Sequence, residues 1–459
     1  MKAPLVAPEL RELISRNDVS TIQDFCRHMH PKAVADFLAT LGPREIWHIL
    51  RALEPQLRAE VFSNLDEDVQ LEIAESLTRD ELAQLISDMP PDDRVDLFKQ
   101  IPPEKQDLIL PALAKAERED IRKLASYPEG TAGSVMTSDY VALPPDITVR
   151  EALERVRLEA PDKETVYYAY VVDDKRRLIG LVSLKDLILA SPHKLVKDIM
   201  RRDVIFARVT DDQEDVARMI QKYDLIALPI INGDNVLVGI ITHDDAVDII
   251  TQEQTEDLEK FMAISGPHEA GVYMKTSVWE FFKRRAPWVI GLAGLELFSG
   301  MVIHHFQVTL MRLVILAFYM PMLAATGGNT GSQSAVLVIR ALALKEISPG
   351  DFFKVLFKEC RVAILIAVTL GSLLWLKVSL FTSGITLPMG LSSAVVGMAI
   401  GVAFAIQVIV AAVIGAALPL VYTAIGIDPA GATSPTLSTI MDVVGMFIYF
   451  SIAKAILGV

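Results

Sequence analysis

An acidic residue lies within one of the most apolar stretches of the sequence. Asp442 stands in "STIMDVVGMFIYF", which has no basic residue close to it. A carboxylate inside a membrane is costly and usually serves a function, such as binding an ion. The alternative is an acid that reaches the membrane surface. We interpret Asp442 as a candidate cation site in a membrane-spanning segment.

A second unusual stretch, "MLAATGGNTGSQSA", combines three glycines with amide and hydroxyl groups but carries no charge. Glycine costs about 1 kcal/mol relative to alanine in a helix interior. One interpretation is close packing of helices through small residues. The other is an unwound helix whose carbonyl oxygens line an ion pathway. The side chains of Asn329, Thr330 and Gln333 favour the second interpretation. The expected pore-lining residues are Gly327, Gly328, Asn329, Gly331 and Gln333.

Two more polar residues lie in apolar segments. Glu296 is expected nearer a membrane face, where it would be a structural partner for Arg312. Gln407 is expected to form a hydrogen bond between helices rather than to bind an ion. Both residues therefore rank below Asp442 as ion ligands.

The segments that hold these residues are long enough to cross a membrane, since apolar runs of about 18 residues or more are typical of transmembrane helices. Five spans are expected, at 288–304, 313–342, 362–381, 392–425 and 437–457. Lys283, Arg284 and Arg285 precede the first span, whereas the loop "TSGITLPMGLSS" has no basic residue. Cytoplasmic loops are the ones enriched in lysine and arginine. We therefore expect a protein of the cytoplasmic membrane, in contact with lipid, with cytoplasmic N-terminal domains and an extracytoplasmic C-terminus.

The first 285 residues are rich in charged residues, and most of the formal net charge of −14 falls there. This acidity argues against a nucleic-acid partner, because phosphates need a basic surface. Two cysteines are too few for a disulfide framework or a cysteine metal cluster. No secretory signal segment is expected at the start. No combination of nucleophile, base and orienting group indicates an enzyme.

Residues 41–112 contain a repeat of twelve residues. Apolar residues recur at this spacing in two series, from Leu41 to Ile101 and from Ile49 to Ile109. Proline and acidic residues follow each member of the first series, and both suit the start of a helix. The repeat therefore predicts one short helix and one turn per unit, stacked as a small solenoid.

Residues 134–252 form two similar halves in which strands and helices alternate. In each half a strand ends in Gly-x-x-Ser or Gly-x-x-Thr and leads into a helix that opens with an acid. The halves resemble a tandem pair of CBS domains, which are regulatory modules that often bind adenine nucleotides. The acidic segment "TQEQTEDLEKFMAISG" follows and is expected to form a connecting helix.

Acidic residues are dense around the junction of these segments. Some of them, such as Asp245 and Asp248, open a helix, where acids are common for structural reasons. Acids gathered on facing domain surfaces would repel one another unless cations lay between them. Mg²⁺ suits such a place, because it keeps several waters and needs only one or two carboxylates.

Three motifs, "PMLAATGGNTGSQSA", "LSTIMDVVGMFIYF" and "EGTAGSVMT", resemble those of the MgtE family of magnesium channels, with Ser134 where the family usually has glycine. The resemblance covers essentially the whole chain. It implies a multidomain membrane protein with an all-α N-terminal superhelical solenoid, α+β tandem CBS domains, a connecting helix and a five-helix all-α transmembrane domain. The implied ranges are 1–130 for the N-terminal domain, 131–199 and 200–253 for the CBS domains, 254–285 for the connecting helix and 286–459 for the pore domain.

The resemblance also implies a homodimer that imports Mg²⁺ through a pore on its two-fold axis. Asp442 of each subunit would hold a hydrated ion, and cytosolic Mg²⁺ would bind regulatory acids and close the pore. The acids that match the family's regulatory positions are Glu60, Asp92, Asp96, Asp212, Glu214, Asp224, Asp245, Asp248, Glu253, Glu256 and Asp257. Tyr168, Lys185 and Asp186 match positions that contact ATP in the family.

Two other functions are compatible with parts of the sequence. A secondary transporter of another divalent cation, such as Co²⁺ or Mn²⁺, driven by an ion gradient would equally explain Asp442. A membrane-tethered CBS nucleotide sensor would explain the CBS pair, but neither Asp442 nor the glycine-rich stretch. Ion flux into liposomes would distinguish the three functions.

Overall fold

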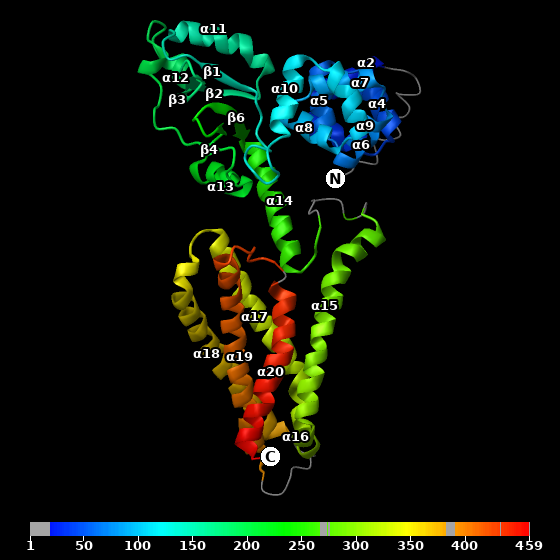
Figure 1. Ribbon diagram of the computed structural model, residues 1–459, viewed down its shortest axis with the longest axis vertical. Helices are drawn as coiled ribbons and strands as arrows, with labels where there is room; N and C mark the ends of the chain where they lie inside the picture. Colours follow the sequence, from blue (N-terminus) through cyan, green and yellow to red (C-terminus); the bar gives the residue numbers. More distant parts are fainter. Residues whose placement is uncertain (1–18, 267–272, 274–275, 382–390, 432, 459) are drawn as a thin grey trace. The chain divides into compact units, whose positions relative to one another are not determined.

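The computed structural model describes residues 19–266, 273, 276–381, 391–431 and 433–458 (Figure 1). These residues belong to two compact units, Met1–Ile250 and Thr251–Val459, which we describe separately. Two predicted features lie outside the described residues. They are the start of the chain, where no signal segment is expected, and most of the loop "TSGITLPMGLSS", which has no basic residue.

Short helices that follow the twelve-residue repeat open the N-terminal unit. They are α2 (Val19–His28), α3 (Pro31–Leu38), α4 (Pro43–Leu50), α5 (Pro55–Ser63), α6 (Glu67–Ser76), α7 (Arg79–Asp88), α8 (Pro91–Gln100), α9 (Pro103–Ile109), the 3₁₀ turn η1 (Leu110–Ala112) and α10 (Lys115–Leu124). From α4 to α10, each helix begins twelve residues after the one before. The prediction of one short helix per repeat is confirmed.

The residue types explain both the helix starts and the stacking. Pro43 and Pro55 each occupy the first helical position, where the N–H that proline lacks would have no partner in any case. Ile49, Val61 and Ile73 of the second apolar series are fully buried. Helices two places apart, such as α4 with α6, contact each other. The repeat therefore builds a continuous apolar core.

The rest of the unit consists of two α+β halves. The first contains β1 (Tyr140–Leu143), α11 (Val149–Glu159), η2 (Ala160–Asp162), β2 (Thr165–Val172), β3 (Leu178–Ser183), α12 (Leu184–Leu189) and η3 (Val196–Asp198). The second contains β4 (Ala207–Arg208), α13 (Gln213–Tyr223), β5 (Ala227–Ile231), β6 (Leu237–Thr242) and the start of α14 (His243–Phe261). Each half has a three-stranded sheet with one parallel and one antiparallel pair. This matches the predicted duplication.

The C-terminal unit is helical. It contains the end of α14, α15 (Val278–His305), α16 (Gln307–Arg312), η4 (Val314–Tyr319), α17 (Met320–Ala343), η5 (Pro349–Asp351), α18 (Phe352–Phe381), α19 (Ser393–Ala424) and α20 (Thr433–Leu457). Figure 1 shows α17, α18, α19 and α20 side by side, in agreement with their contacts. The predicted connecting-helix range differs from these bounds, because α14 begins at His243 and residues 278–285 already belong to α15.

Four segments of the described chain are long and apolar enough to cross a membrane: Val278–His305, Pro349–Phe381, Ser393–Ala424 and Thr433–Leu457. These correspond to the first, third, fourth and fifth predicted spans. The predicted second span corresponds to η4 and α17. Helix α17 has 24 residues and is about 36 Å long, but its glycine-rich polar stretch makes it less apolar.

Candidate ion-binding sites

Acidic side chains from three segments of the N-terminal unit lie close together. The charges of Asp93, Asp245 and Glu164 act on Asp92, and those of Asp244 and Asp93 act on Asp245. We name these five residues the acidic junction. It joins the first turn of α8, the residue before β2 and the first turn of α14.

Burial and nearby negative charge both disfavour ionised carboxylates at the acidic junction. Burial, and then the charges of its neighbours, raises the pKa of Asp92 well above its usual value. Burial and the charges of Asp244 and Asp93 raise the pKa of Asp245 to about 6, although a hydrogen bond from Thr242 opposes them. The Oδ1 atom of Asp92 is buried and has no hydrogen-bond partner among the described residues. A cation at this place would supply the missing positive charge.

A helix cap fixes the position of Asp245. The Thr242 hydroxyl at the end of β6 donates a hydrogen bond of 2.5 Å to Oδ2 of Asp245. The first α+β half repeats this geometry, because the Ser183 hydroxyl donates to Oδ2 of Asp186 at 2.6 Å. The sequence motif therefore determines the cap in both halves. Only the cap of the second half lies among other acids.

Two predicted regulatory acids lie near the acidic junction. Asp96, one turn after Asp92 on α8, interacts with Lys99 and also with Asp93 and Asp245. Asp248 lies one turn after Asp245 on α14 and is exposed. The structure thus brings four predicted acids, Asp92, Asp96, Asp245 and Asp248, to one region. In the described part of the chain, no group of three or more His, Cys, Asp or Glu residues is arranged to hold a metal ion directly.

Glu60 lines a cavity of about 570 Å³ together with Asp88, Asp139 and Glu164, and Glu164 connects this cavity to the acidic junction. Basic residues accompany these acids. Arg58 pairs with Asp88 at 2.8 Å, and Lys163 lies 3.4 Å from Asp139. Part of the negative charge around Glu60 is therefore already neutralised.

Three further predicted acids belong to α13 and are not brought to one place. The Asp212 side chain caps the start of α13 by accepting a hydrogen bond from the Glu214 N–H at 2.9 Å. The Glu214 side chain pairs with Arg218. Asp224 ends α13 in a left-handed conformation with φ of 52°. The 11 residues of α13 separate its two ends by about 16 Å, so these acids cannot share one ion within a single chain.

The predicted acids of the connecting segment, Glu253, Glu256 and Asp257, lie on the C-terminal half of α14. Glu256 forms an ion pair with Lys260 of the same helix. The Lys260 ammonium also lies 2.9 Å from Asp428, in the connection between α19 and α20. One lysine therefore links α14 to the segment that leads into α20.

The three residues predicted to contact a nucleotide come together in the first α+β half. Tyr168 of β2 pairs with Ser183 at the end of β3, and Lys185 and Asp186 follow in the first turn of α12. Arg201 lies 3.9 Å from Oδ2 of Asp186. An aromatic ring, two basic groups and a carboxylate are thus available on one side of this half.

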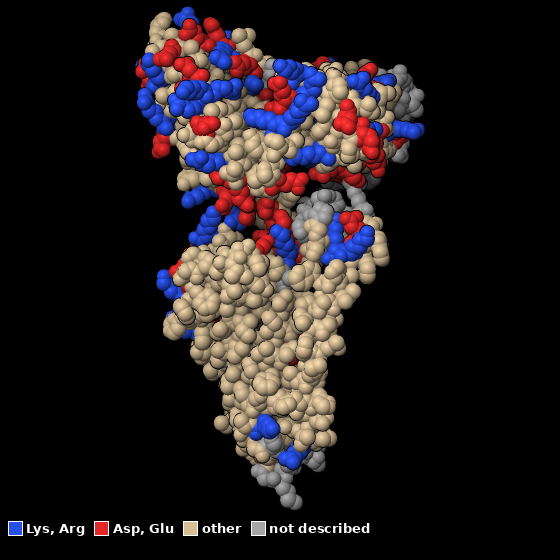
Figure 2. Space-filling view, in the orientation of Figure 1, with Lys and Arg blue, Asp and Glu red and all other residues tan. Residues whose placement is uncertain are grey.

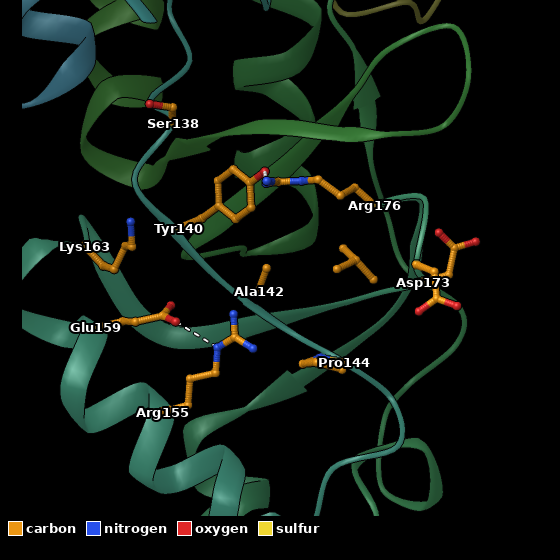
Figure 3. A pocket seen from close by; sticks show the side chains of 11 residues that line it. Ser138, Tyr140, Ala142, Pro144, Arg155, Glu159, Lys163, Asp173 and Arg176 are labelled. Carbon is orange, nitrogen blue, oxygen red and sulfur yellow. Dashed lines mark hydrogen bonds and ion pairs between the residues drawn. The ribbon is translucent and has the colours of Figure 1, made fainter. Parts of the chain in front are cut away.

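The same half contains a cavity of about 580 Å³ that the sequence did not indicate (Figure 3). Strand β1, helix α11 and the turn between β2 and β3 line it. Figure 3 shows Arg176 directed toward the Tyr140 hydroxyl, with a hydrogen bond of 2.9 Å, and Arg155 paired with Glu159. Neither Tyr168 nor Asp186 lines this cavity. It is distinct from the predicted nucleotide site.

In the C-terminal unit, Asp442 lies near the middle of α20 and is partly buried. Glu296 of α15 lies beside it, close enough for the two carboxyl groups to share a hydrogen bond. The predicted partnership of Glu296 with Arg312 is wrong, since Glu296 pairs with Asp442. Each acid was visible in the sequence as the single acidic residue in an apolar span, but their proximity depends on how α15 packs against α20.

The glycine-rich stretch forms a continuous helix. The predicted unwinding of this segment is wrong, because α17 extends without a break from Met320 to Ala343. Gly327, Gly328 and Gly331 are buried. A Cβ atom on Gly415 of α19 would lie only 2.2 Å from the Gly331 carbonyl oxygen. The glycines therefore allow close helix crossing, which is the alternative explanation of the stretch.

The two amide side chains of the same stretch lie on the opposite, exposed face, whereas Thr330 and Ser334 are buried with the glycines. Asn329 and Gln333 are one turn apart and exposed in the single chain. Gln407 of α19 is fully buried, and its Nε2 atom donates to the Leu323 carbonyl of α17 at 2.9 Å. The predicted interhelical hydrogen bond of Gln407 is confirmed.

Comparisons with known proteins agree on one family. The divalent cation transporter family MgtE matches residues 320–452, and the MgtE intracellular N domain matches residues 29–130. The magnesium transporter MgtE of Thermus thermophilus is 39% identical over 340 residues, which cover 74% of this chain and 73% of that protein. This chain belongs to the MgtE family. The magnesium transporter MgtE of Bacillus subtilis is 35% identical over 346 residues, which cover 75% of this chain and 74% of that protein.

Two further matches place the MgtE domains along the chain. CBS domains match residues 132–193 and 196–252, which correspond to the two α+β halves. A crystal structure of the soluble part of a magnesium transporter is 31% identical, with a TM-score of 0.51, and covers 54% of this chain and 97% of its own. The expected membership of this family is confirmed, and the members named here are transporters rather than enzymes.

Proposed function

We propose that this MgtE protein imports Mg²⁺ across the cytoplasmic membrane as a homodimer, with Asp442 of each subunit in the conduction path. The observation that carries this proposal is the position of Asp442, near the middle of an apolar helix of 25 residues. A carboxylate at that depth needs a cation or a proton to offset its charge. In a family of divalent cation transporters, the transported ion is the natural partner.

Two exposed features of the single chain support a dimeric arrangement. In the most apolar stretch of 18 consecutive residues in α15, no residue is fully buried within one chain. This leaves a long apolar face for lipid or a second subunit. Asn329 and Gln333 of α17 are exposed on one face of a membrane helix. Amide oxygens at this depth suit the second hydration shell of Mg²⁺, which keeps most of its waters.

The five-span topology remains part of the proposal. Helix α17 would supply the second span in addition to the four apolar helices, and its polar face would be sheltered from lipid by the second subunit. Lys283, Arg284 and Arg285 lie in the first turns of α15, so the positive-inside rule favours cytoplasmic N-terminal domains. Because the chain starts in the cytoplasm and would cross the membrane five times, its C-terminus would lie outside.

The acidic junction supports regulation by Mg²⁺. Acids from α8 and α14 meet there, and Asp92 is partly buried without a basic partner in the described chain. Mg²⁺ bound between these helices would hold the N-terminal domain against the second CBS domain. A ligand shifts a conformational equilibrium only through its different affinity for the two states. The acidic junction provides such a difference, because a bound ion relieves the repulsion between its acids when they are ionised.

ATP is the proposed ligand of the first CBS domain. Tyr168 offers an aromatic ring for the adenine base, Asp186 can accept hydrogen bonds from ribose hydroxyls, and Lys185 can pair with a phosphate. These three residues lie around the end of β3 and the start of α12. ATP would then modulate the response of the transporter to Mg²⁺.

Flux into proteoliposomes tests the central proposal. The full-length protein is reconstituted, and Mg²⁺ entry is followed with an internal fluorescent indicator at fixed membrane potential. We expect entry that follows the electrochemical gradient of Mg²⁺ without any coupling ion. Entry that requires a proton or sodium gradient would favour a secondary transporter, and the absence of any flux would favour a nucleotide sensor.

A further inference from the structure

Glu296 occupies the covered face of an otherwise exposed helix. Around it on α15, the partly or fully buried residues are Leu292, Glu296, Ser299, Val302 and Ile303, which recur at helical spacing. This face packs against α20. Glu296 is eight residues from both Trp288 and His304, so it lies about 12 Å from either end of the predicted span. Within the predicted span, Glu296 therefore lies no nearer to one end than to the other.

The carboxyl groups of Glu296 and Asp442 meet at this depth. They are close enough to share a hydrogen bond, and the Ser299 hydroxyl donates to the Glu296 carbonyl oxygen at 2.7 Å, one turn along the same helix. Two carboxylates at hydrogen-bond distance repel each other, and the repulsion grows as the dielectric constant falls. The contact is therefore stable only when a positive charge accompanies it.

Basic side chains on the two helices are too far away to supply that charge. Along α15, His304 and Arg285 are eight and eleven residues from Glu296, which corresponds to about 12 and 16 Å. Along α20, Lys454 is twelve residues from Asp442, or about 18 Å. Within the described chain, no ion pair joins either acid to a basic residue. The positive charge has to come from outside the protein.

We propose that Glu296 is a specificity-determining residue of the conduction path, acting with Asp442 as a second carboxylate that favours divalent over monovalent cations. This inference rests on the proposed role of Asp442. Two negative charges per subunit attract a divalent ion far more strongly than a monovalent one. The waters of a hydrated Mg²⁺ can donate hydrogen bonds to both carboxylates.

Charge-neutral and charge-conserving variants test this role. Glu296→Gln keeps the size of the side chain and removes its charge, whereas Glu296→Asp keeps the charge. Glu346→Gln is the matched control, because Glu346 is an exposed acid in the connection after α17. Each full-length variant is reconstituted, and Mg²⁺ and K⁺ flux are measured in the same liposomes. Thermal unfolding in detergent shows whether each variant is folded.

For Glu296→Gln, we expect the Mg²⁺ concentration at half-maximal flux to rise at least about tenfold, the change expected for a loss of 1.4 kcal/mol of binding free energy. The ratio of Mg²⁺ to K⁺ flux should also fall. Glu296→Asp and Glu346→Gln should resemble the unmodified protein. If Glu296→Gln does not fold, Glu296→Asp decides: normal half-saturation and selectivity support the inference, and lost selectivity overturns it.

The result separates this inference from the proposed function. If the unmodified protein carries Mg²⁺, Asp442→Asn abolishes that flux and Glu296→Gln leaves half-saturation and selectivity unchanged, Glu296 only packs α15 against α20 and the inference fails. If Asp442→Asn conducts as well as the unmodified protein, the proposed pore itself is wrong.

Discussion

Acidic residues are crowded in the N-terminal unit and almost absent from the apolar surface of the membrane helices (Figure 2). In the N-terminal unit, five acids make up the acidic junction, and further predicted ligands lie on α5, α13 and α14. In the membrane helices, Asp442 and Glu296 form one pair of neighbouring acids. The two regions meet the same physical problem, which is negative charge without enough water or basic residues.

The two regions differ in how many carboxylates contribute the negative charge that attracts a cation. In the acidic junction several carboxylates act on one another, so that removing one leaves most of the repulsion in place. Such a group responds in a graded way to the cation concentration. In the membrane helices a single pair provides all the nearby negative charge, so one substitution should remove the function. We therefore expect large effects from the pair and smaller ones from the junction.

The largest expected effect is that of Asp442→Asn. The amide has nearly the same size as the carboxylate but no charge, so α20 should pack as before while the conduction path loses its main cation ligand. Mg²⁺ entry into proteoliposomes should fall to the level of empty liposomes. Glu346→Gln serves as control and should conduct normally. An Asp442→Asn protein that is folded and still conducts would contradict the contrast between the two regions.

A smaller effect is expected from neutralising the acidic junction. In the Asp92→Asn, Asp93→Asn and Asp245→Asn triple variant, the repulsion between α8 and α14 is relieved without Mg²⁺. The N-terminal unit should therefore resist limited proteolysis in metal-free buffer, and Mg²⁺ should add little further protection. The factor by which Mg²⁺ slows cleavage should be about tenfold smaller in the variant than in the unmodified protein, equivalent to about 1.4 kcal/mol.

A matched triple variant controls for the loss of charge. Glu72→Gln, Glu75→Gln and Asp80→Asn remove three exposed acids from α6 and α7. This control should keep the normal dependence of proteolysis on Mg²⁺. Equal behaviour of the two triple variants would show that the acidic junction is only a solvated surface.

Protons should partly replace Mg²⁺ at the acidic junction. The pKa of Asp245 is raised from its usual 3.8 to about 6 in the folded protein, so the folded state binds this proton more tightly than the unfolded state. Protonated Asp245 therefore stabilises the folded state fully below about pH 4, and this stabilisation is lost as the pH rises through about 6. Without Mg²⁺, the N-terminal unit should be more stable at pH 5 than at pH 7.5 by about 1–3 kcal/mol.

Chemical denaturation of the full-length protein at the two pH values checks this prediction, with a fluorescence signal from the N-terminal unit. Millimolar Mg²⁺ should narrow the difference, because it stabilises the ionised junction that predominates at pH 7.5. The Asp92, Asp93 and Asp245 triple variant should show a smaller pH effect. A greater stability at pH 7.5 than at pH 5 in metal-free buffer would contradict the argument.

Features that depend on neighbours in the sequence could be predicted. The twelve-residue repeat predicted helices whose starts are twelve residues apart, because helix caps and apolar spacing act within one unit. The duplicated Gly-x-x-Ser/Thr motif predicted two similar halves, and the structure shows the same strand pairing in both. Helices at four of the five expected spans are long and apolar enough to cross a membrane.

Features that depend on packing could not be predicted. Glycines are required both by an unwound helix and by two closely crossing helices, so the sequence of α17 did not distinguish the two. The contact between Gly331 and Gly415 decides for close crossing. Likewise, Glu296 and Asp442 are 146 residues apart in the sequence, and only the packing of α15 on α20 brings them together. The sequence does not specify which helices become neighbours.

The smallest expected effect separates two acids that share one local structure. Asp186 and Asp245 cap α12 and α14 with hydrogen bonds from Ser183 and Thr242 of nearly equal length, 2.6 and 2.5 Å. Their surroundings differ, since Asp186 faces Arg201 at 3.9 Å and Asp245 faces other acids. Asp186→Asn should weaken ATP binding about five- to tenfold, as expected for losing about 1–1.4 kcal/mol of net hydrogen-bond free energy, and leave protection by Mg²⁺ unchanged. Asp245→Asn should have the reverse pattern. Calorimetric titration with ATP and proteolysis at graded Mg²⁺ concentrations measure both effects on the same protein. If both variants change the same property, the shared cap rather than the surroundings determines what these acids do.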